Sequence, residues 1–122
     1  MKYKIDTREN FDIITPLYAQ IDSKLSDQLE ELVDDDSEDG RSLLIDMLNI
    51  ESLNEENTKL LNALHEQMYA KNLSFVLCHV STSCKKKIAS AKLEHVLNIT
   101  PTLIEAIDII SMEDLERELL GE

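Results

Sequence analysis

The chain has 122 residues, of which 43% are hydrophobic, and this length and composition are typical of one globular domain with its own core. It contains only two glycines, Gly40 and Gly121, so it cannot build the clustered-glycine turn through which dinucleotide folds and P-loops approach phosphate. The 12 basic and 25 acidic residues give a net charge of −13, which disfavours nucleic acids and anionic lipid surfaces and favours a partner with basic groups.

No stretch of the sequence resembles a membrane span or a signal peptide. Apolar runs stay far below the roughly 20 residues that cross a bilayer, and the N-terminus lacks an apolar segment. The two cysteines, Cys78 and Cys84, are too few for a disulfide framework and fit free thiols. We therefore expect one cytoplasmic domain over residues 1–122, with no membrane and no nucleic acid as partner.

The N-terminal third predicts an edge hairpin followed by an amphipathic helix. Residues 2–7 alternate between apolar and charged side chains, and a second strand over residues 11–15 follows a polar turn. Apolar residues then recur at helical spacing. The predicted helix begins either at Pro16 or later, at a cap such as Asp22 or Ser23.

The segment that follows the first helix, residues 34–41, is predicted to be a solvated acidic loop, because charge runs usually stay in water. Its spacing, with Gly40 at the sixth position and Asp46 at the twelfth, resembles a calcium-binding EF-hand loop. The predicted exit is a strand rather than a helix, and Asp replaces the usual bidentate Glu. We therefore expect no metal there.

The middle of the chain predicts two strands that are buried on both faces, as in the centre of a parallel sheet. They cover residues 43–48 and 75–80, and His79 interrupts the second. Between them lie a polar stretch, residues 49–57, and a second helix that ends near residues 71–72.

Ser81 is the predicted cap of a third helix, which carries Cys84 on its buried face. Residues 96–99 predict a short strand, and the last helix starts at residues 100–102, because Pro fits a first helical turn. The apolar stripe then changes register, which indicates a bend or a separate helix in the acidic tail, residues 112–122. The result is an α/β fold of order β-β-α-β-α-β-α-β-α, with a mixed sheet of about five strands and about four helices.

Three residues, Cys78, His79 and Cys84, invite a metal or nucleophile interpretation. Neighbours on a strand point to opposite faces, so Cys78 and His79 should not share one zinc ion. Cys84 lies in a first helical turn beside three lysines, which favours a thiolate, but it also fits the apolar stripe. We expect neither metal binding nor catalysis, and we expect the lysine run at 85–87 to neutralise nearby carboxylates.

Several segments recur in the order and spacing of one known family: the strand end Ile45-Asp46, the buried strand Phe75–Cys78, the helix start Ser81-Thr82, and the last helix start Thr102. From Leu43 to Ala106 this frame resembles, without a gap, the STAS domain of bacterial anti-sigma factor antagonists. Earlier, Ala19-Gln20-Ile21-Asp22 is similar to the family's Gly-Glu-Leu-Asp signature, which favours a first helix that begins near Asp22.

The family opens its second helix with Asp-Ser-Ser-Gly-Leu, and a partner kinase phosphorylates the second serine. Glu56 stands at that serine here and has no hydroxyl group. The resemblance implies a partner-binding surface of five residues: Asn54, Glu55, Glu56, Asn57 and Thr58. Either Glu56 is a fixed, partial mimic of phosphoserine, or the partner never reads phosphate. The two acidic residues also suit a first helical turn in their own right.

The sequence alone leaves open whether Ser52 or Thr58 is phosphorylated in place of the family's serine.

This chain also lacks glycines that the family has at several turns. It has Ala19, Asn57, Asn72 or Leu73, and Lys92 at these positions.

The resemblance implies a non-enzymatic interaction module that regulates transcription or signalling by binding a serine-kinase anti-sigma factor or a related regulator, without a cofactor. One alternative is a small-ligand or nucleotide sensor at the same helix start, which Glu55 and Glu56 disfavour by repelling anions. Another is an enzyme with Asp46, His79 and Cys84 in one site at the carboxyl ends of the strands. The edge of the first strand allows a homodimer but does not require one.

Overall fold

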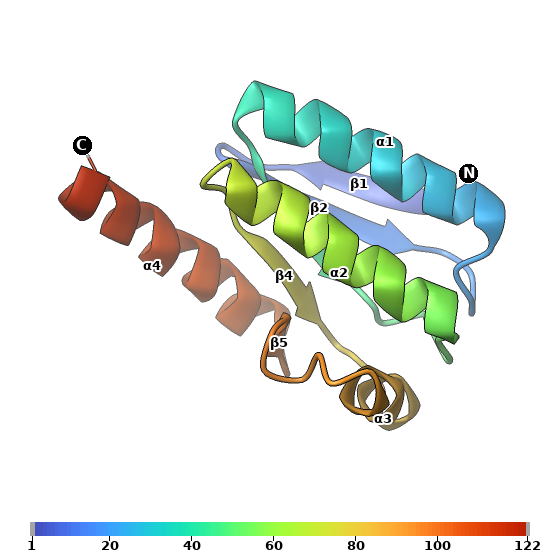
Figure 1. Cartoon of the computed structure of the whole chain (residues 1–122). Helices are drawn as coiled ribbons and strands as arrows, with labels where there is room; N and C mark the ends of the chain where they lie inside the picture. The colour runs from blue at the N-terminus through green and yellow to red at the C-terminus, as the bar shows by residue number, and fades with distance from the viewer. Residues whose placement is uncertain (1, 122) are drawn as a thin grey trace.

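The computed structural model describes residues 2–121 and contains five strands and four helices in the predicted order (Figure 1). The elements are β1 (Tyr3–Thr7), β2 (Phe11–Pro16), α1 (Ser23–Asp39), β3 (Ser42–Asp46), α2 (Glu55–Ala70), β4 (Phe75–Cys78), α3 (Thr82–Ser90), β5 (Asn98–Thr100) and α4 (Leu103–Gly121). Within the described part of the chain, no helix has both the length and the hydropathy needed to cross a bilayer.

The strands form one mixed sheet, and their order in space is their order in the chain, β1-β2-β3-β4-β5. β1 runs antiparallel to β2, and each later strand is parallel to its neighbour. The predicted edge hairpin is therefore confirmed, and β1 has one free edge. β3 lies in the middle of the sheet and is buried along its whole length, as its continuous apolar run predicts.

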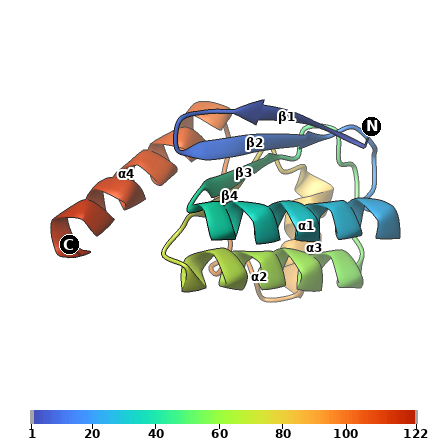
Figure 2. The same ribbon diagram turned by 90° about the horizontal axis from the view of Figure 1, so that it is seen from above.

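The helices cover the two faces of the sheet unequally. Figure 2 shows α1 and α2 side by side beneath the sheet, and with α3 they pack against one face, which carries Leu43 and Ile45. α4 alone packs against the opposite face, where Leu44 meets Ala106 and Ile110. Side chains alternate along β3, so each face contributes its own apolar layer.

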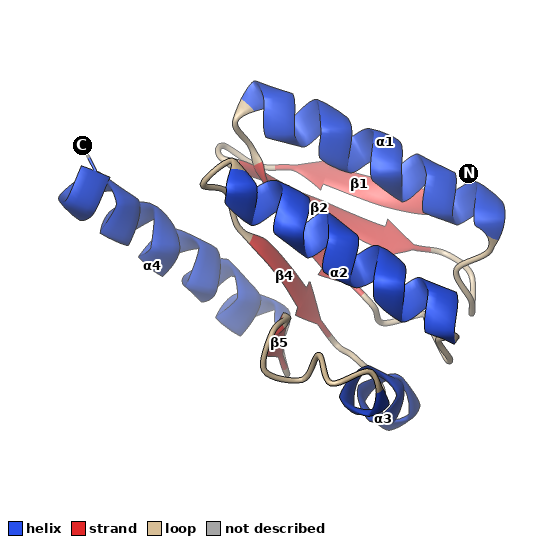
Figure 3. Ribbon diagram, viewed as in Figure 1, coloured by secondary structure: helices blue, strands red, loops and turns tan. Residues whose placement is uncertain are grey.

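The acidic segment predicted as a loop is helical, which corrects that prediction. α1 begins after its cap Asp22, as the resemblance favoured, and continues to Asp39 before the left-handed Gly40, whose φ is 73° (Figure 3). Asp36 is buried rather than solvated. A continuous helix cannot wrap around a cation, so the EF-hand-like spacing has no structural counterpart.

α4 is one continuous helix, so the alternative of a separate last helix is wrong (Figure 3). Its first half packs on the sheet through Ala106 and Ile110. Its second half extends past the sheet, and Met112 and Leu115 are exposed there. The change in apolar register therefore marks the point where the helix leaves the sheet.

The end of the sheet also differs slightly from the prediction. β5 covers Asn98–Thr100, so Val96 lies outside the strand and is exposed. Pro101 stands between β5 and α4 rather than in the first helical turn. Thr102 caps α4 instead, because its Oγ1 accepts a hydrogen bond from the Glu105 backbone N–H at 3.2 Å.

Two of the missing family glycines fall on left-handed helix ends. Asn72 follows α2 with a φ of 61°, and Lys92 follows α3 with a φ of 63°. At both ends the backbone N–H groups of the left-handed residue and of the residue after it donate to carbonyl oxygens of the last helical turn, as in a Schellman motif. The turn geometry is thus present without the glycine that usually adopts it.

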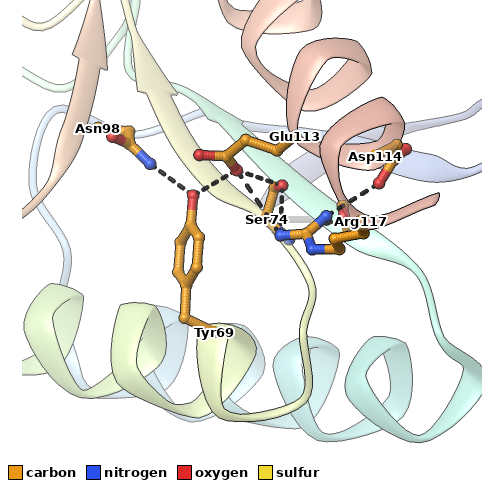
Figure 4. Close-up of polar contacts among 7 residues, drawn as sticks. Tyr69, Ser74, Asn98, Glu113, Asp114 and Arg117 are labelled. Atoms are coloured by element: carbon orange, nitrogen blue, oxygen red, sulfur yellow. Dashed lines mark hydrogen bonds and ion pairs between the residues drawn. The ribbon is translucent and has the colours of Figure 1, made fainter. Parts of the chain in front are cut away.

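A polar cluster fastens the second half of α4 to the body of the protein, and we call it the α4 clamp (Figure 4). The hydroxyl groups of Tyr69 and Ser74 donate to Glu113 Oε1 at 2.7 and 2.5 Å. Arg117 donates to Ser74 Oγ at 3.1 Å, and Asn98 donates to the Tyr69 hydroxyl. Burial and the Glu113 carboxylate raise the pKa of Tyr69, which keeps its hydroxyl protonated as a donor.

Candidate protein-interaction site

The start of α2 is fixed by a reciprocal pair of hydrogen bonds. Asn54 is the cap, and its Oδ1 accepts from the Asn57 backbone N–H at 2.8 Å. In return Asn57 Oδ1 accepts from the Asn54 backbone N–H at 3.0 Å. This capping box satisfies two backbone donors that a helix start otherwise leaves free, so the first turn is rigid.

Asn57 and Thr58 are structural residues. Asn57 Nδ2 donates to the Ile21 carbonyl at 3.0 Å and so ties the start of α2 to the start of α1. The Thr58 hydroxyl donates to the Glu55 carbonyl at 2.7 Å. Only 4% of Asn57 and 1% of Thr58 is exposed, so neither presents a side chain to a partner or a kinase.

The other three predicted site residues, Asn54, Glu55 and Glu56, are exposed. Both carboxylates stand in the first turn of α2, where the positive end of the helix dipole stabilises them. Ser52 precedes them and is half-buried, with its Oγ accepting from Gln20 Nε2 at 3.3 Å. Of the five residues of the predicted surface, only Asn54, Glu55 and Glu56 are therefore accessible to a partner.

The lysines of α3 lie close to this helix start. A hollow of about 480 Å³ is lined by Leu53, which directly precedes Asn54, and by Lys86 and Lys87 of α3. Within the described part of the chain, residues 2–121, the lysines at 85–87 form no ion pair. That these lysines neutralise nearby carboxylates therefore stays a prediction, which no direct ion pair supports. We call Ser52, Asn54, Glu55, Glu56, Lys86 and Lys87 the α2 entry surface.

The three residues of the enzyme hypothesis do not form one site. His79 Nδ1 lies 2.9 Å from Asp46 Oδ1, but Cys84 is buried on the other face of the sheet, with its Sγ 3.9 Å from the Ile50 carbonyl oxygen. Cys78, not Cys84, lies beside the pair. Burial, with the Asp46 carboxylate, raises the pKa of the Cys78 thiol to about 12, which makes it a poor nucleophile.

The grouping of Asp46, Cys78 and His79 is the feature that sequence reasoning missed. It assumed that His79 continues the strand, whereas His79 adopts a φ of 56° directly after β4. The turn brings its ring back toward Cys78, with 3.8 Å between Nδ1 and Sγ. A signal was present, because His79 interrupts an apolar run at a strand end.

Comparison with known proteins gives a family and a set of structural relatives. The family model of the STAS domain matches residues 2–106. No curated protein matches the chain in sequence. Among solved structures, a serine-to-glutamate variant of RsbS from Moorella thermoacetica has a TM-score of 0.78 at 18% identity, over 96% of this chain and 99% of that one.

An anti-sigma factor antagonist from Mycobacterium paratuberculosis has a TM-score of 0.75 at 19% identity, over 89% of this chain and 92% of that one. The anti-sigma factor antagonist SpoIIAA in its unphosphorylated form has a TM-score of 0.74 at 14% identity, over 90% of this chain and 96% of that one. These similarities show that the chain shares the fold of these proteins. The chain therefore belongs to the STAS domain family.

Proposed function

We propose that the protein is a non-enzymatic interaction module that acts as an anti-sigma factor antagonist or in a closely related role. In this proposal the whole chain is one domain, and the α2 entry surface binds a serine-kinase anti-sigma factor or another cytoplasmic signalling regulator. The observation that carries the proposal is the rigid, doubly tied start of α2, which presents two exposed carboxylates. A rigid surface loses little entropy on binding, so such an arrangement suits recognition.

The charges of the surface describe the partner. Glu55 and Glu56, together with the net charge of −13, favour basic groups on the partner. Lys86 and Lys87 favour an acidic group of the partner at the edge of the interface. A partner with a basic patch bordered by acidic residues would match both. Electrostatic steering of this kind raises the association rate and weakens with added salt.

Phosphorylation at the position of Glu56 cannot control this binding, because Glu56 has no hydroxyl group. A carboxylate carries about one negative charge, whereas phosphoserine carries about 1.5 to 2 and three acceptor oxygens, so the mimicry is partial. The buried Thr58 hydroxyl is unsuited as a relocated phosphosite. Ser52 is the one hydroxyl of the α2 entry surface, so it is the position at which modification has to be tested.

Two features support a role without catalysis or nucleotide binding. The Cys78 thiol is buried and its pKa is raised, and Cys84 lies apart from Asp46 and His79. Neither hollow at the start of α2 has the size and enclosure of a ligand pocket. The one between Gln20 and Asn57 holds about 200 Å³, below the usual range of about 300–1,000 Å³, and the one of about 480 Å³ beside Lys86 and Lys87 is a shallow depression that opens widely to solvent. The neighbouring carboxylates would also repel a nucleotide phosphate.

The experiment measures binding of the full chain to each serine-kinase anti-sigma factor encoded in the same genome, by calorimetry, with and without ATP. We expect one partner to bind the natural chain equally well in both conditions. Glu56→Ser should bind the same partner without ATP and lose affinity with ATP, as mass spectrometry detects a phosphoryl group on the new serine.

Glu66→Ser is the matched control, because Glu66 is exposed on the same helix outside the α2 entry surface. It should bind like the natural chain and stay unmodified. If Glu56→Lys and Glu66→Lys weaken binding equally, the site is elsewhere. If the natural chain gains a phosphoryl group on Ser52 and then dissociates, the proposed independence from phosphorylation is wrong.

A further inference from the structure

We propose that Asp46, Cys78 and His79 form a binding site for a divalent transition-metal ion, with Zn²⁺ as the best match, in which the fourth coordination position is open to solvent. The proposal does not depend on the function proposed above. It rests on three potential ligand atoms, a carboxylate oxygen, a thiol sulfur and an imidazole nitrogen, which all lie within 4.8 Å of one another.

The backbone places the first two ligands. β3 and β4 are parallel neighbours, and Asp46 pairs directly with Cys78 in their register. Each is the last residue of its strand. Paired residues of adjacent strands point to the same face of a sheet, so the carboxylate and the thiol lie side by side on the face that α4 covers.

His79 joins them through an uncommon backbone conformation. A residue that continued β4 would point to the opposite face, but a φ of 56° turns His79 out of the strand. Its Nδ1 then lies 2.9 Å from Asp46 Oδ1 and 3.8 Å from Cys78 Sγ. A left-handed histidine costs energy that glycine would not, and such positions gather at functional sites.

Two of the three distances between the ligand atoms lie near those of a zinc site, and the third, between the Asp46 oxygen and the Cys78 sulfur, is within 4.8 Å. Tetrahedral zinc with bonds of about 2.3 Å to sulfur and about 2.0–2.2 Å to nitrogen and oxygen needs roughly 3.6 Å between S and N, and roughly 3.4 Å between N and O. The observed distances of 3.8 and 2.9 Å need adjustments of only a few tenths of an ångström. Thiolate and imidazole ligands select zinc and its neighbours over magnesium or calcium.

The surroundings orient the ligands and leave a path to solvent. The Leu48 backbone N–H donates to Asp46 Oδ1 at 3.0 Å, which holds the carboxylate in place as an outer-shell partner does in metal sites. Asp46 also lines a hollow of about 210 Å³ between β1, β2 and the start of α4. The His79 side chain is 32% exposed. An ion and its water can therefore reach the site from this side.

The test uses the reduced full-length protein and Co²⁺ as a spectroscopic probe for zinc. We expect one Co²⁺ per chain, with the near-ultraviolet charge-transfer band of a cobalt–thiolate bond and the visible bands of tetrahedral cobalt. Zn²⁺ should abolish both by competition. Cys78→Ser should remove the thiolate band, and Asp46→Asn and His79→Gly should each weaken binding at least about ten-fold.

Three matched variants keep the proposal falsifiable. His79→Gly should fold well, because glycine favours the observed φ, so its loss of metal cannot be attributed to unfolding. Cys84→Ser and His95→Gln replace the other cysteine and an exposed histidine, and both should retain the full cobalt spectrum. No thiolate band at equimolar Co²⁺, or equal loss in Cys84→Ser and Cys78→Ser, would overturn the assignment.

Discussion

Replacement of Asp36 with Asn should stabilise the protein increasingly as the pH rises from 5 to 8. Asp36 lies near the end of α1, is 5% exposed, and its Oδ2 has no hydrogen-bond partner. Burial and the neighbouring Asp12 carboxyl group raise the pKa of Asp36 to about 7. Asp12 holds the negative charge instead. Burial alone would raise the pKa of Asp12, but the hydrogen bond from Arg41 and the neighbouring Asp36 carboxyl group keep it below its usual value.

The sign of the effect follows from the raised pKa. Between the ordinary value of 3.8 and about 7, the folded protein holds a proton on Asp36 that the unfolded chain has released. This bound proton contributes its full share to the free energy of unfolding below pH 3.8, and that contribution is lost as the pH rises through about 7. At 1.36 kcal/mol per pKa unit the full loss is about 4 kcal/mol, and solvent screening reduces it to about 1–2 kcal/mol.

The assay is urea unfolding of the natural protein and Asp36→Asn at pH 5, 6, 7 and 8. The difference in the free energy of unfolding should grow by about 1–2 kcal/mol in favour of Asn across this range. An Asn side chain cannot ionise, and it can donate to Asp12 as the protonated carboxyl group does. The m-values should stay equal, because both proteins expose the same surface on unfolding.

Asp35→Asn is the matched control, because it removes the same charge from an exposed position one residue away. It separates the Asp12–Asp36 pair from the general repulsion of a chain with net charge −13. A difference that stays flat from pH 5 to 8, or that Asp35→Asn reproduces, would refute the claim that Asp36 carries a proton in the folded protein.

Two further substitutions test the helix ends and the α4 clamp. Lys92→Gly should raise the free energy of unfolding in urea by about 0.5–1 kcal/mol, because Lys92 has a φ of 63°. Lys71→Gly, at an ordinary φ of −99°, should give no such gain, and an equal gain would contradict the explanation. Tyr69→Phe removes the hydroxyl group that donates a hydrogen bond to Glu113. It should lower the free energy of unfolding by about 1 kcal/mol and speed hydrogen exchange in the second half of α4. Tyr18→Phe, at an exposed position, should leave exchange there unchanged.

Periodicity predicted well those elements whose pattern of burial stays the same along their whole length. β3 and β4 are continuous apolar runs because α4 covers one side of the sheet and α1 to α3 the other. The caps Asp22 and Ser81 could be predicted because a short polar side chain just before an apolar stripe commonly caps a helix.

The last turns of α1 escaped prediction because their stabilising partners come from distant strands. Asp and Ser disfavour helix interiors, so a local reading ends the helix early. Asp36 faces Asp12 of β2, and Arg41 links Asp12 to the carbonyl oxygens of Glu9 and Phe11. Tertiary contacts of this kind leave no periodic pattern in the sequence.

The position of the start of α2 was predicted, but the exposure of its side chains was not. The resemblance located the start of α2, yet only the three-dimensional contacts separate exposed Glu55 and Glu56 from buried Asn57 and Thr58. Family spacing could not predict this, because the hydrogen bond from Asn57 to the Ile21 carbonyl joins segments 36 residues apart.

The order of the strands has a consequence for how the chain assembles during synthesis. Each strand pairs with the strand made just before it, so the sheet can grow outward from the first hairpin without waiting for a distant segment. The face with Ile13, Leu44 and Val76 is different, because its cover is α4, which follows all five strands. Until α4 docks, a nascent chain carries a bare apolar sheet surface. The arrival of that helix should therefore end the period in which the new chain is most prone to aggregate.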